Sequence, residues 1–234
     1  MIEASPTVLN FVWTASFTVM TAYYIYLILL LVACLLGFWC RKSDHTLKII
    51  MWLLFALVVT EAIVYVMAIT MKLKPQFFLL YHIYVPIEYL FVSLYFSKHI
   101  AWARINTAFY LLAGMVVLVD IYLSLIAGDV FSYPGKNLNV SGFLIIAWSA
   151  TALFSIRPEI DRSIFSFPVF WIGIGFLIYY SGSFFHNFIY GLLIKSDSGL
   201  AAKLNAIINK GVNDVLYICI SIAFICSHRL KKYT

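Results

Sequence analysis

The residues of this sequence that could do chemistry are ionisable side chains embedded in long apolar stretches. Moving a charged side chain to the centre of a bilayer costs about 3 kcal/mol or more, so each such residue is a candidate for function. Because successive spans run in opposite directions, nearly all of them fall between the middle of the bilayer and its outer surface. Such groups can bind a small ligand or exchange protons. The candidate ligand-binding residues are Glu61, His82, Glu88, Asp120, His186, Asn187, Lys210 and Asp214.

Helical spacing places several of these residues on shared faces. Residues three or four positions apart lie on the same side of an α-helix. Pro86 stands two positions before Glu88, where it removes a backbone hydrogen bond and leaves carbonyls that a buried polar group can use. The spacing predicts two inward-facing stripes, one of Lys210, Asp214, Tyr217 and Ser221 and one of Tyr179, Gly182, His186 and Tyr190.

Each candidate also has a purely structural interpretation. Lys210 and Asp214 stand one turn apart and could neutralise each other. Glu61 could be a protonated carboxyl group that hydrogen-bonds a neighbouring helix. His186 and Asn187 could form an interhelical hydrogen-bonding pair. The functional hypothesis therefore depends on the whole set of residues more than on any member.

The elements that must position these residues are membrane-spanning helices. The chain is 64% hydrophobic and only 11% charged, against about a quarter charged in a soluble domain, which excludes a soluble enzyme. A span needs roughly 20 apolar residues. We therefore expect an all-α, integral membrane bundle of seven transmembrane helices in one domain (residues 1–234). The expected helices are 17–40, 47–71, 76–97, 104–126, 138–156, 165–194 and 204–227, preceded at Val8–Ser16 by an interfacial segment or an extension of the first helix.

The distribution of Lys and Arg predicts the orientation of the chain, because cytoplasmic loops retain these residues. It places the N-terminus outside and the C-terminus in the cytoplasm, as a multi-pass protein of the plasma (inner) membrane. An odd number of spans agrees with this result. One side would hold Arg41, Lys42, Lys48, Lys98, Arg104, Arg157, Arg162, Arg229, Lys231 and Lys232, and the other Lys72, Lys74, Lys136, Lys195 and Lys203.

Short connections and dispersed charge limit the partners that we expect. The links between spans leave no room for a folded module, so an output would come from a separate cytoplasmic or membrane signalling partner. The net charge of +6 is spread in short clusters between apolar runs, which is typical of helix anchors and argues against nucleic-acid binding. The expected partners are the lipid bilayer, a small-molecule ligand and a signalling protein.

Two enzyme or cofactor families share part of this pattern. Seven spans with Lys210 in the last one resemble the rhodopsin plan, which would imply retinal and a counter-ion at Glu88. However, Lys210 precedes Asp214, the reverse of the order in microbial rhodopsins, so retinal is not expected. His82 and His186 with Asp214 or Glu88 are similar in ligand type to membrane hydrolases that hold zinc with three histidines and an aspartate, but the last span lacks their H-x-x-x-H pair.

A third resemblance extends over the whole chain, but only in the number and order of its membrane-spanning helices. The segments His82–Tyr89 (HIYVPIEY) and Asn213–Tyr217 (NDVLY) are similar to segments of small bacterial seven-helix membrane proteins of uncharacterised function that look like sensor modules. This resemblance implies no chemistry.

The leading hypothesis is a receptor-like or sensory module without a cofactor, rather than an enzyme. It would bind a small ligand or protons in an outward-facing polar pocket between helices two, three, six and seven, and signal through a partner. The alternatives are a metal-dependent intramembrane hydrolase, with zinc as its cofactor at His82, His186 and Asp214, and a proton-coupled transporter.

Overall fold

The structure is a computed structural model of a helical bundle. It describes residues 6–40, 44–67, 76, 78–100, 105–126, 130–131, 134–157, 163–193 and 198–232, with side chains except at 6–19, 186–193, 198–207, 209 and 230–232. The helices are α1 (Pro6–Cys40), α2 (Leu47–Tyr65), α3 (Phe78–Ser97), α4 (Ile105–Leu125), α5 (Gly135–Ser155), the 3₁₀ turn η2 (Ile164–Ser166), α6 (Pro168–Leu193) and α7 (Ser198–Lys232).

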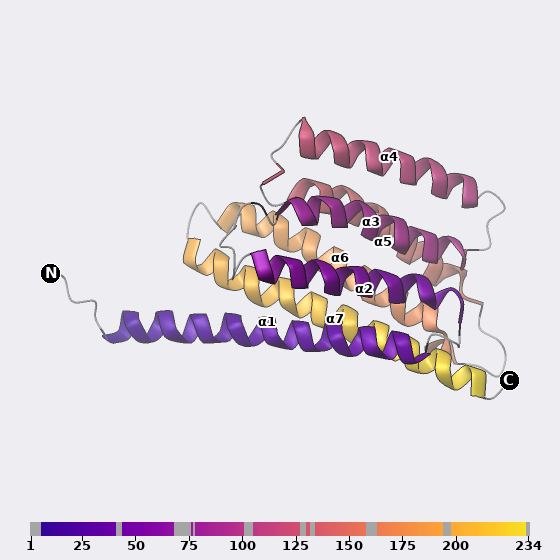
Figure 1. Cartoon of the computed structure of the whole chain (residues 1–234), viewed down its shortest axis with the longest axis horizontal. Helices are drawn as coiled ribbons and strands as arrows, with labels where there is room; N and C mark the ends of the chain where they lie inside the picture. The colour runs from indigo at the N-terminus through magenta and orange to yellow at the C-terminus, as the bar shows by residue number, and fades with distance from the viewer. Residues whose placement is uncertain are drawn as a thin grey trace.

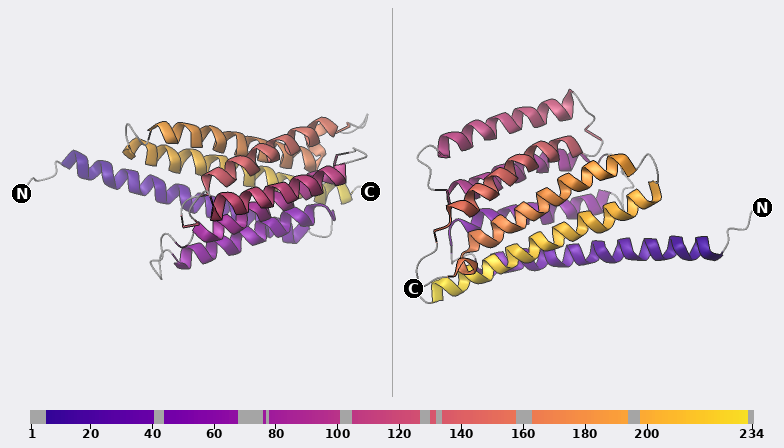
Figure 2. Two further views of the ribbon diagram at one scale, coloured as in Figure 1. Left: turned by 90° about the horizontal axis from the view of Figure 1, so that it is seen from above. Right: turned by 180° about the vertical axis from the view of Figure 1, so that it is seen from behind.

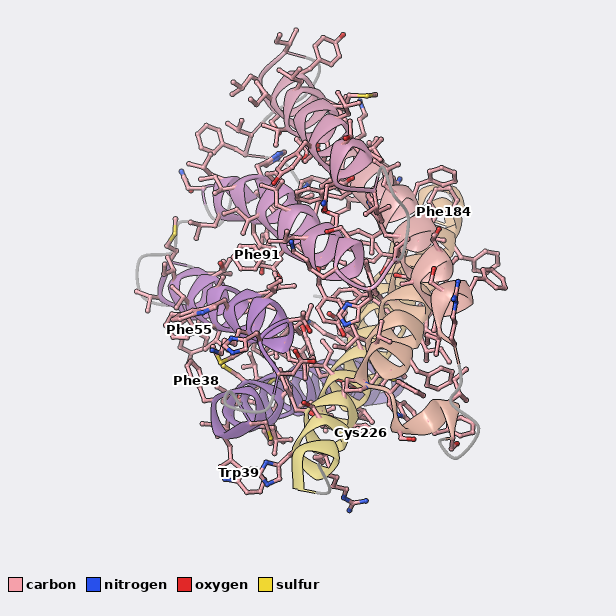
Figure 3. All side chains as sticks on the ribbon, turned by 90° about the vertical axis from the view of Figure 1, so that its right-hand side faces the viewer. Phe38, Trp39, Phe55, Phe91, Phe184 and Cys226 are labelled. Atoms are coloured by element: carbon pink, nitrogen blue, oxygen red, sulfur yellow. The ribbon has the colours of Figure 1, made fainter. Side chains whose placement is uncertain are left out.

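All seven α-helices are long and apolar enough to cross a membrane. Their most apolar segments have a mean hydropathy between 1.3 and 2.3, and the described residues contain no β-strand. Large apolar side chains cover the outside of the bundle, where Figure 3 shows Phe55, Phe184 and Trp39 at the periphery. The expected all-helical fold with seven candidate spans is therefore confirmed, and its apolar exterior fits contact with lipid.

Six of the helices form a closed ring, and α4 lies outside it. Around the ring α1 contacts α2, α2 contacts α3, α3 contacts α5, α5 contacts α6, α6 contacts α7, and α7 returns to α1. α4 packs against α3 and α5 and is the uppermost helix in Figure 1. The two further views in Figure 2 show the same side-by-side arrangement of the rods.

Some helix boundaries differ from the expected ones. α1 begins at Pro6, so Val8–Ser16 is an extension of the first helix, which projects beyond the other helices in Figure 1. Proline favours such a first turn because its missing N–H would have no helical partner there. α7 is longer than expected at both ends, whereas α2 ends its regular α-helix at Tyr65.

The most tightly buried part of the core lies at the end of the ring where α1 ends and α2 begins. Ile50, Phe96 and Phe224 are at most 1% exposed. Gly37 lets α1 approach α7 here, because a Cβ atom on it would lie 3.0 Å from the Phe224 ring. The opposite half of the ring is packed less completely and contains the cavity described next.

Candidate functional site

A cavity of about 290 Å³ lies inside the ring of six helices. Every ring helix contributes to its wall, and none of its lining residues comes from α4. The volume corresponds to roughly ten water molecules, enough for a small organic ligand. The lining residues are Tyr26, Leu53, Leu54, Leu57, Glu61, Phe78, Tyr81, Tyr84, Val85, Glu88, Pro134, Leu138, Phe176, Tyr179, Lys210, Asn213, Leu216, Tyr217 and Ile220.

Glu61 is held in the cavity wall by two tyrosine hydroxyls. Tyr26 of α1 donates to Glu61 Oε1 at 2.9 Å, and Tyr81 of α3 donates to the same oxygen at 3.2 Å. Glu61 is 7% exposed, and these two donors replace part of the hydration that its carboxyl group would have in water. Glu61 thus connects α1, α2 and α3 through one oxygen atom.

Lys210 reaches the cavity over aromatic faces rather than over a carboxylate. Its Nζ atom lies 3.7 Å from the centroid of the Tyr26 ring and 5.1 Å from that of the Tyr23 ring. The ring quadrupole attracts the ammonium group in this geometry. Lys210 makes no hydrogen bond and no ion pair within 4.0 Å with the residues that the structure describes.

Asp214 and Lys210 attract each other electrostatically, as one structural interpretation expected, but they make no direct ion-pair contact within 4.0 Å. Asp214 is outside the cavity lining, and its Oδ1 atom has no hydrogen-bond partner. On α7 the cavity is lined instead by Asn213, whose Oδ1 atom accepts from the Tyr217 hydroxyl at 3.3 Å. Of the predicted α7 stripe, Lys210 and Tyr217 therefore line the cavity, whereas Asp214 and Ser221 do not.

Glu88 lies on the α3 wall, one and a half to two turns beyond Tyr81 along the helix. It is 6% exposed, and its carboxyl group interacts with the Tyr180 side chain of α6. Pro86 stands inside α3 beside it, as the sequence predicted. Glu88 and Tyr180 thus connect α3 to α6, two ring helices that lie on either side of α5.

His82 and Asp120 lie apart from the cavity in a second polar cluster, between α3, α4 and α5. His82 Nδ1 is 2.8 Å from Ser124 Oγ. Asn137 Nδ2 donates to the same Ser124 oxygen at 3.0 Å and to the backbone carbonyl of Asp120 at 3.2 Å. Neither carboxylate oxygen of Asp120 has a hydrogen-bond partner, and the residue is 3% exposed. The cluster attaches α4 to the outside of the ring.

Two further candidates, His186 and Asn187, lie on α6, but their side chains are outside the described part of the structure. Among the described residues, no three His, Cys, Asp or Glu side chains are close enough together to hold a metal ion. A zinc site would therefore need at least one side chain outside the described residues, such as that of His186. Of the eight predicted residues, the structure places Glu61, Glu88 and Lys210 around one cavity.

Sequence reasoning did not identify the tyrosines that hold these groups, above all Tyr26 and Tyr180. Both are buried at 3% exposure. A tyrosine buried in the middle of a span needs a hydrogen-bond partner, whereas tyrosines at the ends of spans belong to the interfacial belt. The position of Tyr26 and Tyr180 in the middle of their spans is therefore the sequence feature that distinguishes them from interfacial tyrosines.

The inner end of the cavity borders the buried core. One turn beyond the lining residues Leu53 and Ile220 stand Ile50 of α2 and Phe224 of α7, which belong to the fully buried core. The chain matches no protein-family model, and no curated protein or solved structure is significantly similar to it.

Proposed function

We propose that this protein is a receptor-like or sensory membrane module that binds a small ligand in the cavity of the ring. The observation that supports the proposal is the cavity itself, in which Glu61, Glu88 and Lys210 from three helices meet an aromatic lining. Ligand sites are typically concave, mostly apolar and provided with a few polar groups that orient the ligand.

The pocket faces outward in this proposal. Glu61 lies near the end of α2, while Tyr81 and Lys210 lie toward the beginnings of α3 and α7, so all three share one end of the bundle. The connections at this end carry fewer Lys and Arg residues than those at the other end. The positive-inside rule then places the entrance outside the plasma (inner) membrane and the Lys-rich C-terminus in the cytoplasm.

Helix displacement would transmit the signal to a cytoplasmic or membrane partner. Glu61 connects three helices and Glu88 connects two, so a ligand that competes for the tyrosine partners of these carboxyl groups changes contacts across the ring. α7 runs from the cavity to the basic end of the chain and therefore couples the pocket to the proposed cytoplasmic face.

Cysteine labelling tests the pocket and its orientation. Leu57→Cys places a thiol in the cavity wall, and we expect a membrane-impermeant maleimide to label it only from the side of the N-terminus. Leu118→Cys is the matched control, because Leu118 is 69% exposed on α4 where the proposal places lipid, and it should remain unlabelled. The four native cysteines are replaced by alanine in both variants.

The outcomes separate this proposal from its alternatives. Labelling of Leu57→Cys from both sides would indicate alternating access and favour a transporter. Labelling from the C-terminal side alone would show that the orientation is the reverse of the proposed one. Absence of labelling from either side would contradict the proposed outward-facing pocket.

A further inference from the structure

Polar groups are distributed unevenly along the depth of the cavity. Glu61, Tyr81 and Lys210 lie at the entrance level, whereas Leu53, Leu54, Phe176, Leu216 and Ile220 form most of the inner wall. With a rise of 1.5 Å per residue, the lining extends over about 12 Å of α2 and about 15 Å of α7. The cavity is therefore elongated along the helices, with one polar end and an inner wall that is largely apolar but also contains Glu88 and Tyr217.

The charged groups of the cavity differ in how well the protein satisfies them. Glu61 accepts hydrogen bonds from two tyrosines, and Glu88 has Tyr180 as its partner. Lys210 has three N–H donors, and no described side chain accepts a hydrogen bond from them. The Tyr26 and Tyr23 ring faces lie against the ammonium group, and Glu61 and Asp214 attract it without hydrogen-bonding to it. The protein therefore leaves a positive hydrogen-bond donor open at the entrance level.

The size of the cavity limits what can reach this donor. A volume of about 290 Å³ is at the lower end for organic ligands. It accommodates one chain of about ten heavy atoms but not a phospholipid with two acyl chains. The apolar inner wall accepts such a chain, since burying each CH₂ group gains about 0.8 kcal/mol relative to water.

We propose that the ligand of this cavity is a single-chain anionic amphiphile whose acidic head group binds the Lys210 ammonium while its chain extends along Leu53, Leu54 and Leu216. This inference rests on the proposed function and specifies the class of its ligand. A carboxylate head would accept charge-assisted hydrogen bonds from Nζ, and the Tyr26 ring would hold the ammonium from the opposite side.

Photoaffinity labelling in lipid nanodiscs tests this proposal. The probe is a decanoic acid that carries an alkyl diazirine, and the labelled residues are mapped by mass spectrometry. We expect labels on cavity-lining residues of α2 and α7, and protection by excess decanoate that exceeds protection by decylamine or decanol. Lys210→Met should weaken the protection by decanoate about tenfold or more, whereas Lys210→Arg should retain it.

Two variants control for folding and for nonspecific charge effects. Lys48→Met removes a cation from the other end of α2, outside the cavity, and should not change the labelling. Leu57→Trp fills the cavity and should abolish labelling of its wall without removing the charge at Lys210.

The possible results distinguish failure of the proposed anionic ligand from failure of the proposed pocket. Protection by decylamine or decanol that equals or exceeds that by decanoate, or equal protection in Lys210→Met, would overturn the anionic ligand while leaving the pocket in place. Absence of any label on the cavity wall would overturn the proposed ligand pocket as well.

Discussion

At the scale of single residues, the carboxyl group of Glu61 shows how the bundle tolerates a charged side chain. Removing an ionisable group from water is compensated only when nearby donors replace its hydration. Tyr26 and Tyr81 provide such donors from two helices, and the Tyr26 ring also receives the Lys210 ammonium. Tyr26 is thus a shared support for an acid and a base that do not contact each other directly.

This double role of Tyr26 leads to a prediction about its hydroxyl group. Tyr26→Phe keeps the ring under Lys210 and removes the hydroxyl group that donates to Glu61 and also interacts with Tyr217. We expect the free energy of unfolding in nanodiscs or mild detergent to fall by about 1 kcal/mol. Tyr110→Phe is a suitable control, because Tyr110 is 71% exposed on α4. Equal stability of the Tyr26→Phe and Tyr110→Phe variants would show that the hydrogen bond to Glu61 contributes nothing measurable.

The residue types were largely visible in the sequence, but their grouping was not. Glu61, Glu88 and Lys210 were identified because charges are rare in apolar spans. His82 and Asp120 satisfied the same criterion, yet they lie between α3, α4 and α5 with Ser124 and Asn137. The rarity of charges and their depth in a span give no information about which face each helix turns toward the inside of the ring. They could therefore not separate the residues around the cavity from those beside α4.

At the scale of elements, small residues determine how closely the ring helices approach each other. Gly142 of α5 lies against Tyr180 of α6, so that an added Cβ atom would be 2.6 Å from Tyr180 Cδ1. Tyr180 is in turn the partner of Glu88. Gly182 of α6 makes a similarly close approach to Val212 of α7. The distance between α5 and α6 therefore affects the position of Tyr180, and through it the position of Glu88 in the cavity wall.

The contact between Gly142 and Tyr180 provides a prediction with a control inside the same chain. Gly142→Ala should lower the free energy of unfolding by about 1–2 kcal/mol, because the buried Tyr180 ring must move, despite the higher helix propensity of alanine. Gly114→Ala on α4, where the added Cβ atom meets no atom within 4 Å, should leave stability unchanged or raise it slightly. Thermal unfolding of both variants measures the difference, and a more stable Gly142→Ala protein would contradict the tight contact.

At the scale of the whole molecule, the protein consists of a closed ring of six helices and one further helix, α4, that packs against the outside of this ring. The six ring helices enclose the cavity, whereas α4 borders only its outer side. Asn137 connects α5 to α4 by donating to Ser124 Oγ and to the Asp120 carbonyl. The ring therefore closes without α4, and no residue of α4 lines the cavity.

This organisation predicts a local effect of removing the Asn137 amide. Asn137→Ala should lower the stability of the protein by about 1 kcal/mol and speed hydrogen–deuterium exchange in α4 more than in α1 or α7. Thr151→Ala is the matched control, because the Thr151 hydroxyl bonds only the Ala147 carbonyl of its own helix in the described contacts. A uniform increase in exchange over all helices would show that α4 and the ring unfold as one unit.

The sequence by itself determined that this chain is all-helical with seven candidate spans and which charged residues lie within them. These properties follow from local composition: an apolar stretch must satisfy its backbone internally, and a charge within it is conspicuous. Only the tertiary structure decided that six helices close into a ring, that Tyr26 and Tyr180 support the acids, and that Asp120 lies outside the cavity. Those properties depend on the order of helices around the ring and on the rotation of each helix, which result from the packing of side chains far apart in the chain.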